Sequence, residues 1–232
     1  MYSGIVNFFR DGGFFLYPMA ALFVAGIAIA VERFIVLTRA STTNRQLWEK
    51  ITPCLKAGNF GEAANVAAKS GTALGTVLSY GLARTKITHR RDDVEKAMEE
   101  SLLEIIPKLE KRTHYLSSMA NVGMLIGLLG TVSGLISAFG AIATANPAEK
   151  ASLLAASISV AMNNTASGLA VAITLLTAHM FLEARTTGLI DSLEIAALKF
   201  LNTVTERTAV APASPAPQPA VPRGAAPARG LA

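Results

Sequence analysis

Three apolar runs, each long enough to cross a membrane, constrain this chain more than any other feature of its sequence. They extend over residues 14–31, 119–145 and 153–181, and the first is closed by the charged pair Glu32-Arg33. A spanning helix needs about 20 consecutive apolar residues, and the mean hydropathy of the whole chain is +0.42. With 232 residues, the chain is too short for many further spans. The sequence therefore predicts an all-α membrane protein with three transmembrane helices.

Positive charge gives these predicted spans an orientation. Residues 39–118 carry thirteen lysines and arginines, whereas the short connection 146–150 carries one. Because flanking positive charge resists translocation, we expect residues 39–118 and the C-terminus to be cytoplasmic, and the N-terminus to lie outside. The net charge of +5 follows from this bias, so we do not expect binding to nucleic acid.

Periodicity and composition complete the predicted organisation. Apolar side chains recur every three or four residues over 91–109, and only Pro107 interrupts the helical pattern before the second span, so we expect a kinked helix there. Within 41–68, Gly58 separates two predicted helices. The expected segments are an N-terminal interfacial segment (1–13), the first transmembrane helix (14–38), a cytoplasmic helical domain (39–118), the second transmembrane helix (119–145), the third transmembrane helix (153–181), a long cytoplasmic helical extension (182–207) and a disordered Pro/Ala-rich tail (208–232).

Small residues follow one side of the second span. Gly127, Gly130 and Gly134 recur there at steps of three and four residues. A helix side made of such residues lets another backbone approach closely. Thr131 is the main polar residue on this side, and Ser133 is displaced to its flank. We therefore expect the second span to pack tightly against another helix around a hydroxyl group.

The third span is more polar than helix packing alone requires. Thr165 and Gly168 fall on one face, Asn163 and Ser167 fall on a roughly opposite face, and Asn164 adds polarity nearby. Two polar faces imply two neighbours other than lipid. A helix within a ring of protomers, between an adjacent subunit and an enclosed lumen, would satisfy this pattern. A three-helix bundle in a monomer, with the asparagines bonding across helices, is the alternative.

Titratable side chains are nearly absent from the second and third spans. Between Ala120 and Met180 the sequence has Glu149 and Lys150 at the short connection and His179 near the end of the third span. A proton relay usually needs a titratable group at membrane depth, so a partner would have to supply one. The sequence has no nucleophile motif, phosphate-binding loop or metal-ligand cluster, so we expect neither an enzyme nor a cofactor or metal site.

The chain resembles the MotA/TolQ/ExbB proton-channel family, and within it the three-span ExbB/TolQ branch. The resemblance covers about residues 1–205. It rests on four motifs: Gly12-Gly13 with Tyr17-Pro18, Glu32-Arg33-Phe34, the stretch from Ala120 to Phe139 with its Gly127-Leu-Leu-Gly-Thr-Val element, and the stretch from Thr165 to Ile173. One departure is Val160, where the family commonly has a glutamate. This departure makes a divergent branch, driving a different envelope machine, plausible.

The resemblance implies a function and partners. It implies a homo-oligomer, a pentamer, in the bacterial inner membrane, whose second and third helices surround a pore. An ExbD/TolR-like single-span partner would supply a pore aspartate. Proton motive force would then drive mechanical work on a cell-envelope machine for outer-membrane transport, envelope maintenance or motility, through a TonB/TolA-like or motility effector. A non-conducting oligomeric scaffold and a sodium-driven stator of the same architecture are the alternatives.

The resemblance also assigns roles to the polar and small residues of the spans. Thr131 and Thr165 match the pore threonines of the family, and their hydroxyls can both donate and accept hydrogen bonds. Four further residues provide supporting polar groups: Asn163, Asn164, Ser133 and Ser167. Four glycines provide the helix packing: Gly127, Gly130, Gly134 and Gly168.

Overall fold

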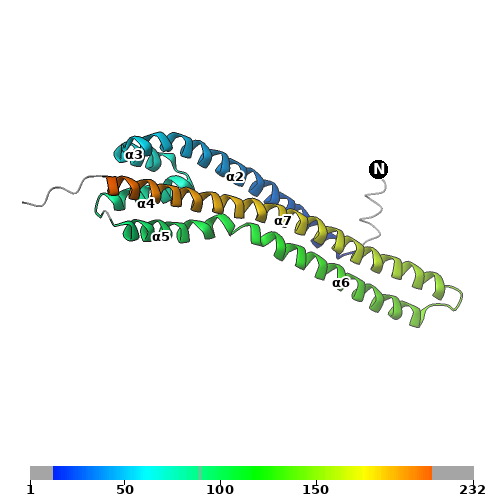
Figure 1. Ribbon diagram of the computed structural model, residues 1–232. Helices are drawn as coiled ribbons and strands as arrows, with labels where there is room; N and C mark the ends of the chain where they lie inside the picture. Colours follow the sequence, from blue (N-terminus) through cyan, green and yellow to red (C-terminus); the bar gives the residue numbers. More distant parts are fainter. Residues whose placement is uncertain (1–12, 89, 211–232) are drawn as a thin grey trace, which may run out of the picture.

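The computed structural model describes residues 13–88 and 90–210, and throughout this part the chain forms helices joined by short turns (Figure 1). The helices are α2 (Leu16–Ala57), α3 (Phe60–Ser70), α4 (Ala73–Thr85), α5 (Arg91–Glu110), α6 (Thr113–Thr144) and α7 (Lys150–Val210). Three stretches are long and apolar enough to cross a membrane: Leu16–Ala57, Arg91–Thr144 and Lys150–Glu206. The described residues therefore confirm the prediction of an all-α protein with three such helices.

The molecule is elongated, and its helices fall into two parts (Figure 1). α3, α4 and α5 gather at one end, while α6 and α7 form an antiparallel hairpin that extends beyond α2 at the other end. We call residues 39–112 and 182–210 the helical domain, and residues 13–38 and 113–181 the spanning half. α2 and α7 run unbroken through both parts, so neither helix ends at a predicted membrane boundary.

Local sequence explains how the helices of the helical domain begin and end. Gly58 ends α2 with φ of 79°, a left-handed conformation that glycine adopts without strain. The Asn59 side chain then caps α3 by accepting a hydrogen bond from the backbone N–H of Glu62 at 3.3 Å. Thr72 caps α4 in the same way, with its Oγ1 3.0 Å from the Gly75 nitrogen. The helix, glycine turn and second helix predicted within residues 41–68 are all present.

Large apolar side chains fill the interior of the helical domain. Phe200 of α7 belongs to this core and is fully buried. The absence of a side chain at Gly81 of α4 makes room here, because a Cβ atom there would lie 2.7 Å from Met98 Sδ and 3.0 Å from Phe200 Cε1. The other buried members of this core include Leu47, Ile51, Leu55, Val77, Leu78, Leu82, Val94 and Leu193.

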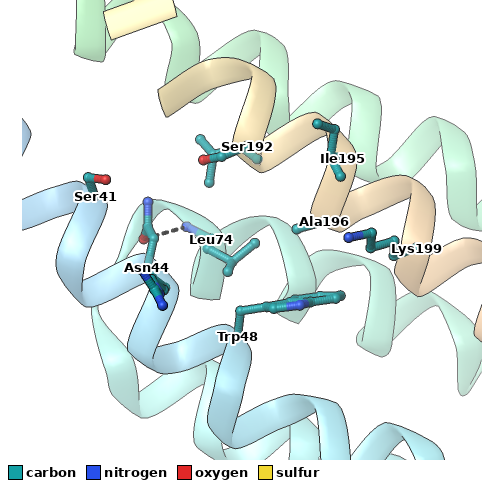
Figure 2. Close-up of a pocket in the computed structure, with 10 residues that line it drawn as sticks. Ser41, Asn44, Trp48, Leu74, Ser192, Ile195, Ala196 and Lys199 are labelled. Carbon is teal, nitrogen blue, oxygen red and sulfur yellow. Dashed lines mark hydrogen bonds between the residues drawn. The ribbon is translucent and has the colours of Figure 1, made fainter. Parts of the chain in front are cut away.

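Asn44 ties α2 to the start of α4 beside a pocket of about 320 Å³ (Figure 2). Its Oδ1 accepts a hydrogen bond from the Leu74 backbone N–H at 3.3 Å, one of the first four N–H groups of α4, which have no partner within the helix. Figure 2 shows Trp48 on one wall of the pocket and Lys199 of α7 on another. Asn44 itself is only 4% exposed, so this bond is buried between the helices.

The helix predicted to run from residue 91 into the second span is interrupted. α5 ends at Glu110 and α6 begins at Thr113. Pro107 lacks a backbone N–H, but the interruption lies a turn beyond it, where the Lys111 nitrogen donates to the Pro107 carbonyl at 3.0 Å. The Leu109 carbonyl accepts a hydrogen bond from the Arg33 side chain of α2. A contact from another helix therefore marks the interruption, and this contact could not be seen in the local sequence.

The two ends of the chain are only partly described. Residues 1–12 of the predicted interfacial segment and residues 211–232 of the predicted tail lie outside the described residues. α7 continues to Val210, so residues 208–210, placed by the sequence at the start of the tail, are helical. The extension 182–207 is part of the same helix.

Candidate functional site in the α6–α7 seam

α6 and α7 approach each other closely at a pair of glycines. A Cβ atom on Gly127 would lie 2.9 Å from the Cα of Gly168, and one on Gly168 would lie 2.8 Å from the Cα of Gly127. Both distances are shorter than a real Cβ can approach a backbone atom. Any side chain at either position would therefore push the two helices apart. We call the contact between α6 and α7 around these glycines the seam.

Two further glycines extend the seam along α6. Gly130 faces Asn164, whose Cβ would be 2.9 Å from a Cβ placed on the glycine. Gly134 faces Ala161, with a corresponding distance of 3.0 Å. The structure thus places all four glycines singled out in the sequence along one helix contact. Small residues permit such close packing in a membrane, where lipid is as apolar as leucine.

Thr131 and Thr165 face each other across this seam. Their Oγ1 atoms are hydrogen bonded, and either one can be the donor. Thr131 Oγ1 also lies 3.2 Å from the Gly127 carbonyl oxygen and 3.3 Å from that of Ala161, and Thr165 Oγ1 lies 3.5 Å from the Gly127 carbonyl. One hydroxyl can therefore donate to the other while the second donates to a carbonyl, and these roles can be reversed.

This pair differs from the other threonines of the third span. A threonine in a membrane helix often bonds only the carbonyl four residues earlier. Thr174 and Thr177 do so, with distances of 2.8 Å to the carbonyl oxygens of Ala170 and Ile173. Thr131 makes this bond as well, but it also reaches α7. Its hydroxyl therefore links two helices.

Asn164 brings an unsatisfied acceptor to the same level of the seam. It precedes Thr165 in α7 and packs on Gly130, which precedes Thr131 in α6. The residue is 3% exposed, and its Oδ1 has no hydrogen-bond partner among the described residues. A buried polar atom without a partner is costly in an apolar surrounding. The seam therefore has capacity to accept one more hydrogen bond beside the threonine pair.

The structure does not bring Asn163, Ser133 and Ser167 into this cluster. Ser167 Oγ donates to the Asn163 carbonyl at 2.7 Å, within α7. Its side chain lines an apolar groove of about 250 Å³ between α7 and α2, together with Met19 and Phe23. Ser133 is half-buried on α6, and none of the described hydrogen bonds joins it to either seam threonine. The helices that carry these residues were predicted correctly, but their neighbours in the fold could not be predicted from the sequence.

The two polar faces of the third span meet two helices of the same chain. One face packs on α6 along the seam, and Ser167 on the other face points toward α2. Gly26 brings α2 close to α7, since a Cβ there would lie 2.6 Å from Leu175 Cδ2. Part of the second neighbour expected from the sequence is therefore α2 of the same chain.

The Ala161 carbonyl is a participant that sequence reasoning did not single out. Helical spacing places Ala161 on the face of Thr165, four residues earlier, and that spacing is the only signal. An alanine side chain carries no polar group, so its backbone oxygen becomes part of the site only because Thr131 approaches it from α6 to 3.3 Å. A backbone carbonyl of this kind becomes part of a site only when a second helix packs against it.

The three apolar helices and the polar, closely packed seam define a multi-pass membrane protein built around a helix interface with paired hydroxyls. Residues 69–195, more than half of the chain, match the profile of the MotA/TolQ/ExbB proton channel family. The chain belongs to this family. A relative named as a biopolymer transport protein ExbB homolog, from Methanothermobacter thermautotrophicus, is 28% identical over 197 residues, which are 84% of this chain and 68% of the relative.

Proposed function

We propose that this protein is the channel-forming subunit of a proton-driven stator, in which α6 and α7 border the proton path. The observation that carries the proposal is the hydroxyl pair of Thr131 and Thr165 across the glycine seam. Hydroxyls that can exchange donor and acceptor roles suit a water-assisted proton path. The match to a proton channel family over residues 69–195 supports this role.

A partner supplies the titratable group in this proposal. The stretch from Ala120 to Met180 has Glu149 and Lys150 beside the short turn and His179 at the opposite end of the span. No carboxylate of the second or third span therefore lies at the depth of the threonine pair. We propose an ExbD/TolR-like single-span partner whose aspartate lies beside that pair. The similarity to a relative named as an ExbB homolog supports this choice of branch.

Several copies of the chain surround the proton path in this proposal, with a pentamer as the expected number. One chain leaves most of its spanning surface uncovered, since only 17% of the most apolar window of the α5–α6 stretch is buried. Large apolar side chains of α6 are exposed on the single chain: Val122, Leu125, Leu128, Leu129, Val132, Ile136 and Phe139. Neighbouring copies and lipid are the surroundings that suit such a surface.

The proposed setting is a bacterial inner membrane with the helical domain and C-terminus in the cytoplasm. The thirteen lysines and arginines of residues 39–118 support this orientation. Each proton that crosses provides about 2.3 kcal/mol per 100 mV of membrane potential. We propose that this energy is converted to mechanical work on a cell-envelope machine, through a TonB/TolA-like or motility effector, without a cofactor or metal.

Substitution of the two threonines tests the proposal. Thr131→Val, Thr165→Val and the double variant, expressed with the partner, keep side-chain shape but remove the hydroxyls. We expect proton-driven output and proton flux into vesicles to fall by roughly a hundredfold or more, the scale of one well-placed proton-transfer group, while cross-linking still detects the oligomer. Thr177→Val is the matched control, because the Thr177 hydroxyl bonds only within its own helix at 2.8 Å.

The possible results separate the three candidate functions. Full output from the double variant would overturn the channel and favour a non-conducting scaffold. Lost output together with a lost oligomer would place the threonines in assembly. Output that follows a sodium gradient after the proton gradient is collapsed would identify a sodium-driven stator.

A further inference from the structure

Three consecutive residues at the end of the first span each contact a different helix. Glu32, Arg33 and Phe34 lie in α2 where the spanning half meets the helical domain. Successive residues of an α-helix point about 100° apart, so three of them can reach neighbours on three sides. We call these three residues the clasp.

Arg33 contacts the end of α5. Its Nη2 donates to the Leu109 carbonyl oxygen at 3.0 Å, and the side chain is buried with 5% of the residue exposed. Leu109 lies in the last turn of α5, where carbonyls lack a donor from their own helix. Arg33 therefore supplies a charged hydrogen bond at the interruption between α5 and α6, across 76 residues of sequence.

Glu32 contacts the start of α6. Its carboxylate forms an ion pair with the guanidinium of Arg112, the residue that immediately precedes α6. The two side chains are 48% and 56% exposed, so the pair is well solvated and adds little to stability. The pair connects α2 to the residue that precedes α6.

Phe34 contacts α7. Its ring stacks on that of Phe181 with 6.2 Å between centroids, and the Arg185 guanidinium carbon lies 5.8 Å from the Phe34 centroid and 5.1 Å from the Phe181 centroid. The cation above two aromatic faces is a favourable arrangement. The clasp thus contacts the end of α5, the residue before α6 and the middle of α7.

We propose that the clasp is a positioning element that sets the placement of α6 against α7, and so the alignment of Thr131 with Thr165. α6 starts at the interruption, and Thr131 lies about 27 Å along the helix from Thr113 at 1.5 Å per residue. A small tilt at the junction therefore displaces the threonine.

Cysteine cross-linking across the seam tests this proposal without measuring proton flow. In a Cys54→Ser background of the full chain, Gly134→Cys with Ala161→Cys places two sulfurs across α6 and α7, where the two Cβ positions are 3.0 Å apart. We expect rapid disulfide formation in membranes. Arg33→Met should slow it by about tenfold, the factor for one hydrogen bond to a charged group, and Arg33→Lys should restore most of the rate.

A charge exchange tests the second contact, and an exposed arginine is the control. Glu32→Arg and Arg112→Glu should each slow the cross-link, and the double variant should recover it. Arg39→Met changes an exposed arginine of the same helix and should have no effect. If Arg33→Met does not accumulate, the half-exposed Glu32 and Arg112 still permit the test. Unchanged cross-linking in both the Arg33→Met and the single charge variants would overturn the proposal.

The clasp rests on the proposed function only through the threonine alignment. The cross-link reports the position of α6 whether or not protons pass. A cross-link that responds to Arg33→Met, together with full output from Thr131→Val, would retain the clasp and reject the proton path. A cross-link that does not respond to Arg33→Met or to the single charge variants, together with lost output from Thr131→Val, would retain the proton path and reject the clasp.

Discussion

The helical domain and the α6–α7 seam of the spanning half bury different kinds of residue. In the helical domain the fully buried side chains are large, among them Ile51, Leu78, Met98 and Phe200. In the spanning half, the buried residues of the seam are small, with Gly127, Gly130 and Ala161 among them, and large apolar side chains cover the outside. α7 contributes to both arrangements within one unbroken helix.

The difference follows from the solvent of each part. Water favours burial of large apolar surface, which drives the packing of the helical domain. A lipid tail is as apolar as leucine, so helices in a membrane gain from close contact and hydrogen bonds instead. The seam supplies both, through glycines in backbone contact and a threonine pair. A polar site can therefore be built in the seam, while large side chains such as Leu116 and Leu175 are buried elsewhere in the spanning half.

Among the substitutions that test this comparison, we expect the largest loss in the free energy of unfolding at Phe200. Phe200→Ala removes a fully buried ring from the helical domain, and we expect the free energy of unfolding to fall by about 3–5 kcal/mol. Urea unfolding in detergent, followed by circular dichroism, measures it. Phe139→Ala is the control in the spanning half, where the ring is 65% exposed. Equal losses from the two variants would contradict the proposed division.

A single added methyl group distinguishes the seam from the rest of α6. Gly127→Ala places a Cβ 2.9 Å from the Gly168 backbone, and we expect a loss of about 1–3 kcal/mol from overpacking, measured by unfolding in detergent. Gly140→Ala, on the same helix, has nothing within 4 Å of the new atom. We expect that control to be neutral or stabilising because alanine favours helix. A neutral Gly127→Ala would mean that the seam is not closely packed.

The smallest expected difference in stability between the two parts is at their buried asparagines, Asn44 and Asn164. Asn44→Leu leaves the Leu74 N–H of the helical domain without its acceptor, so we expect a loss of about 1–3 kcal/mol. Asn164→Leu removes an amide whose Oδ1 has no partner in the seam, so the free energy of unfolding should change less or rise. Denaturant midpoints of the two variants measure the difference. A larger loss at Asn164 would show that its amide is already bonded in the assembly.

Much of the seam was predictable because it depends on helical spacing. Gly127, Thr131 and Gly134 recur at intervals that put them on one side of any helix, and small residues in an apolar run indicate close packing. Ser167 illustrates the limit. Its spacing correctly separates it from Thr165, but nothing local indicates that α2 covers it. The interruption between α5 and α6 could not be predicted from the local sequence either, because Arg33 reaches the Leu109 carbonyl there from a distant part of the chain.

The sequence by itself determined the number of apolar helices, the faces on which small and polar residues lie, and the family. These properties follow from composition and from the fixed geometry of a helix, which each segment carries alone. Only the tertiary structure decided which faces meet: Thr131 with Thr165, Asn164 with Gly130, and the clasp with three helices. The physical reason is that the clasp contacts join residues 76 and 80 positions apart, and such pairings depend on how all the helices pack together.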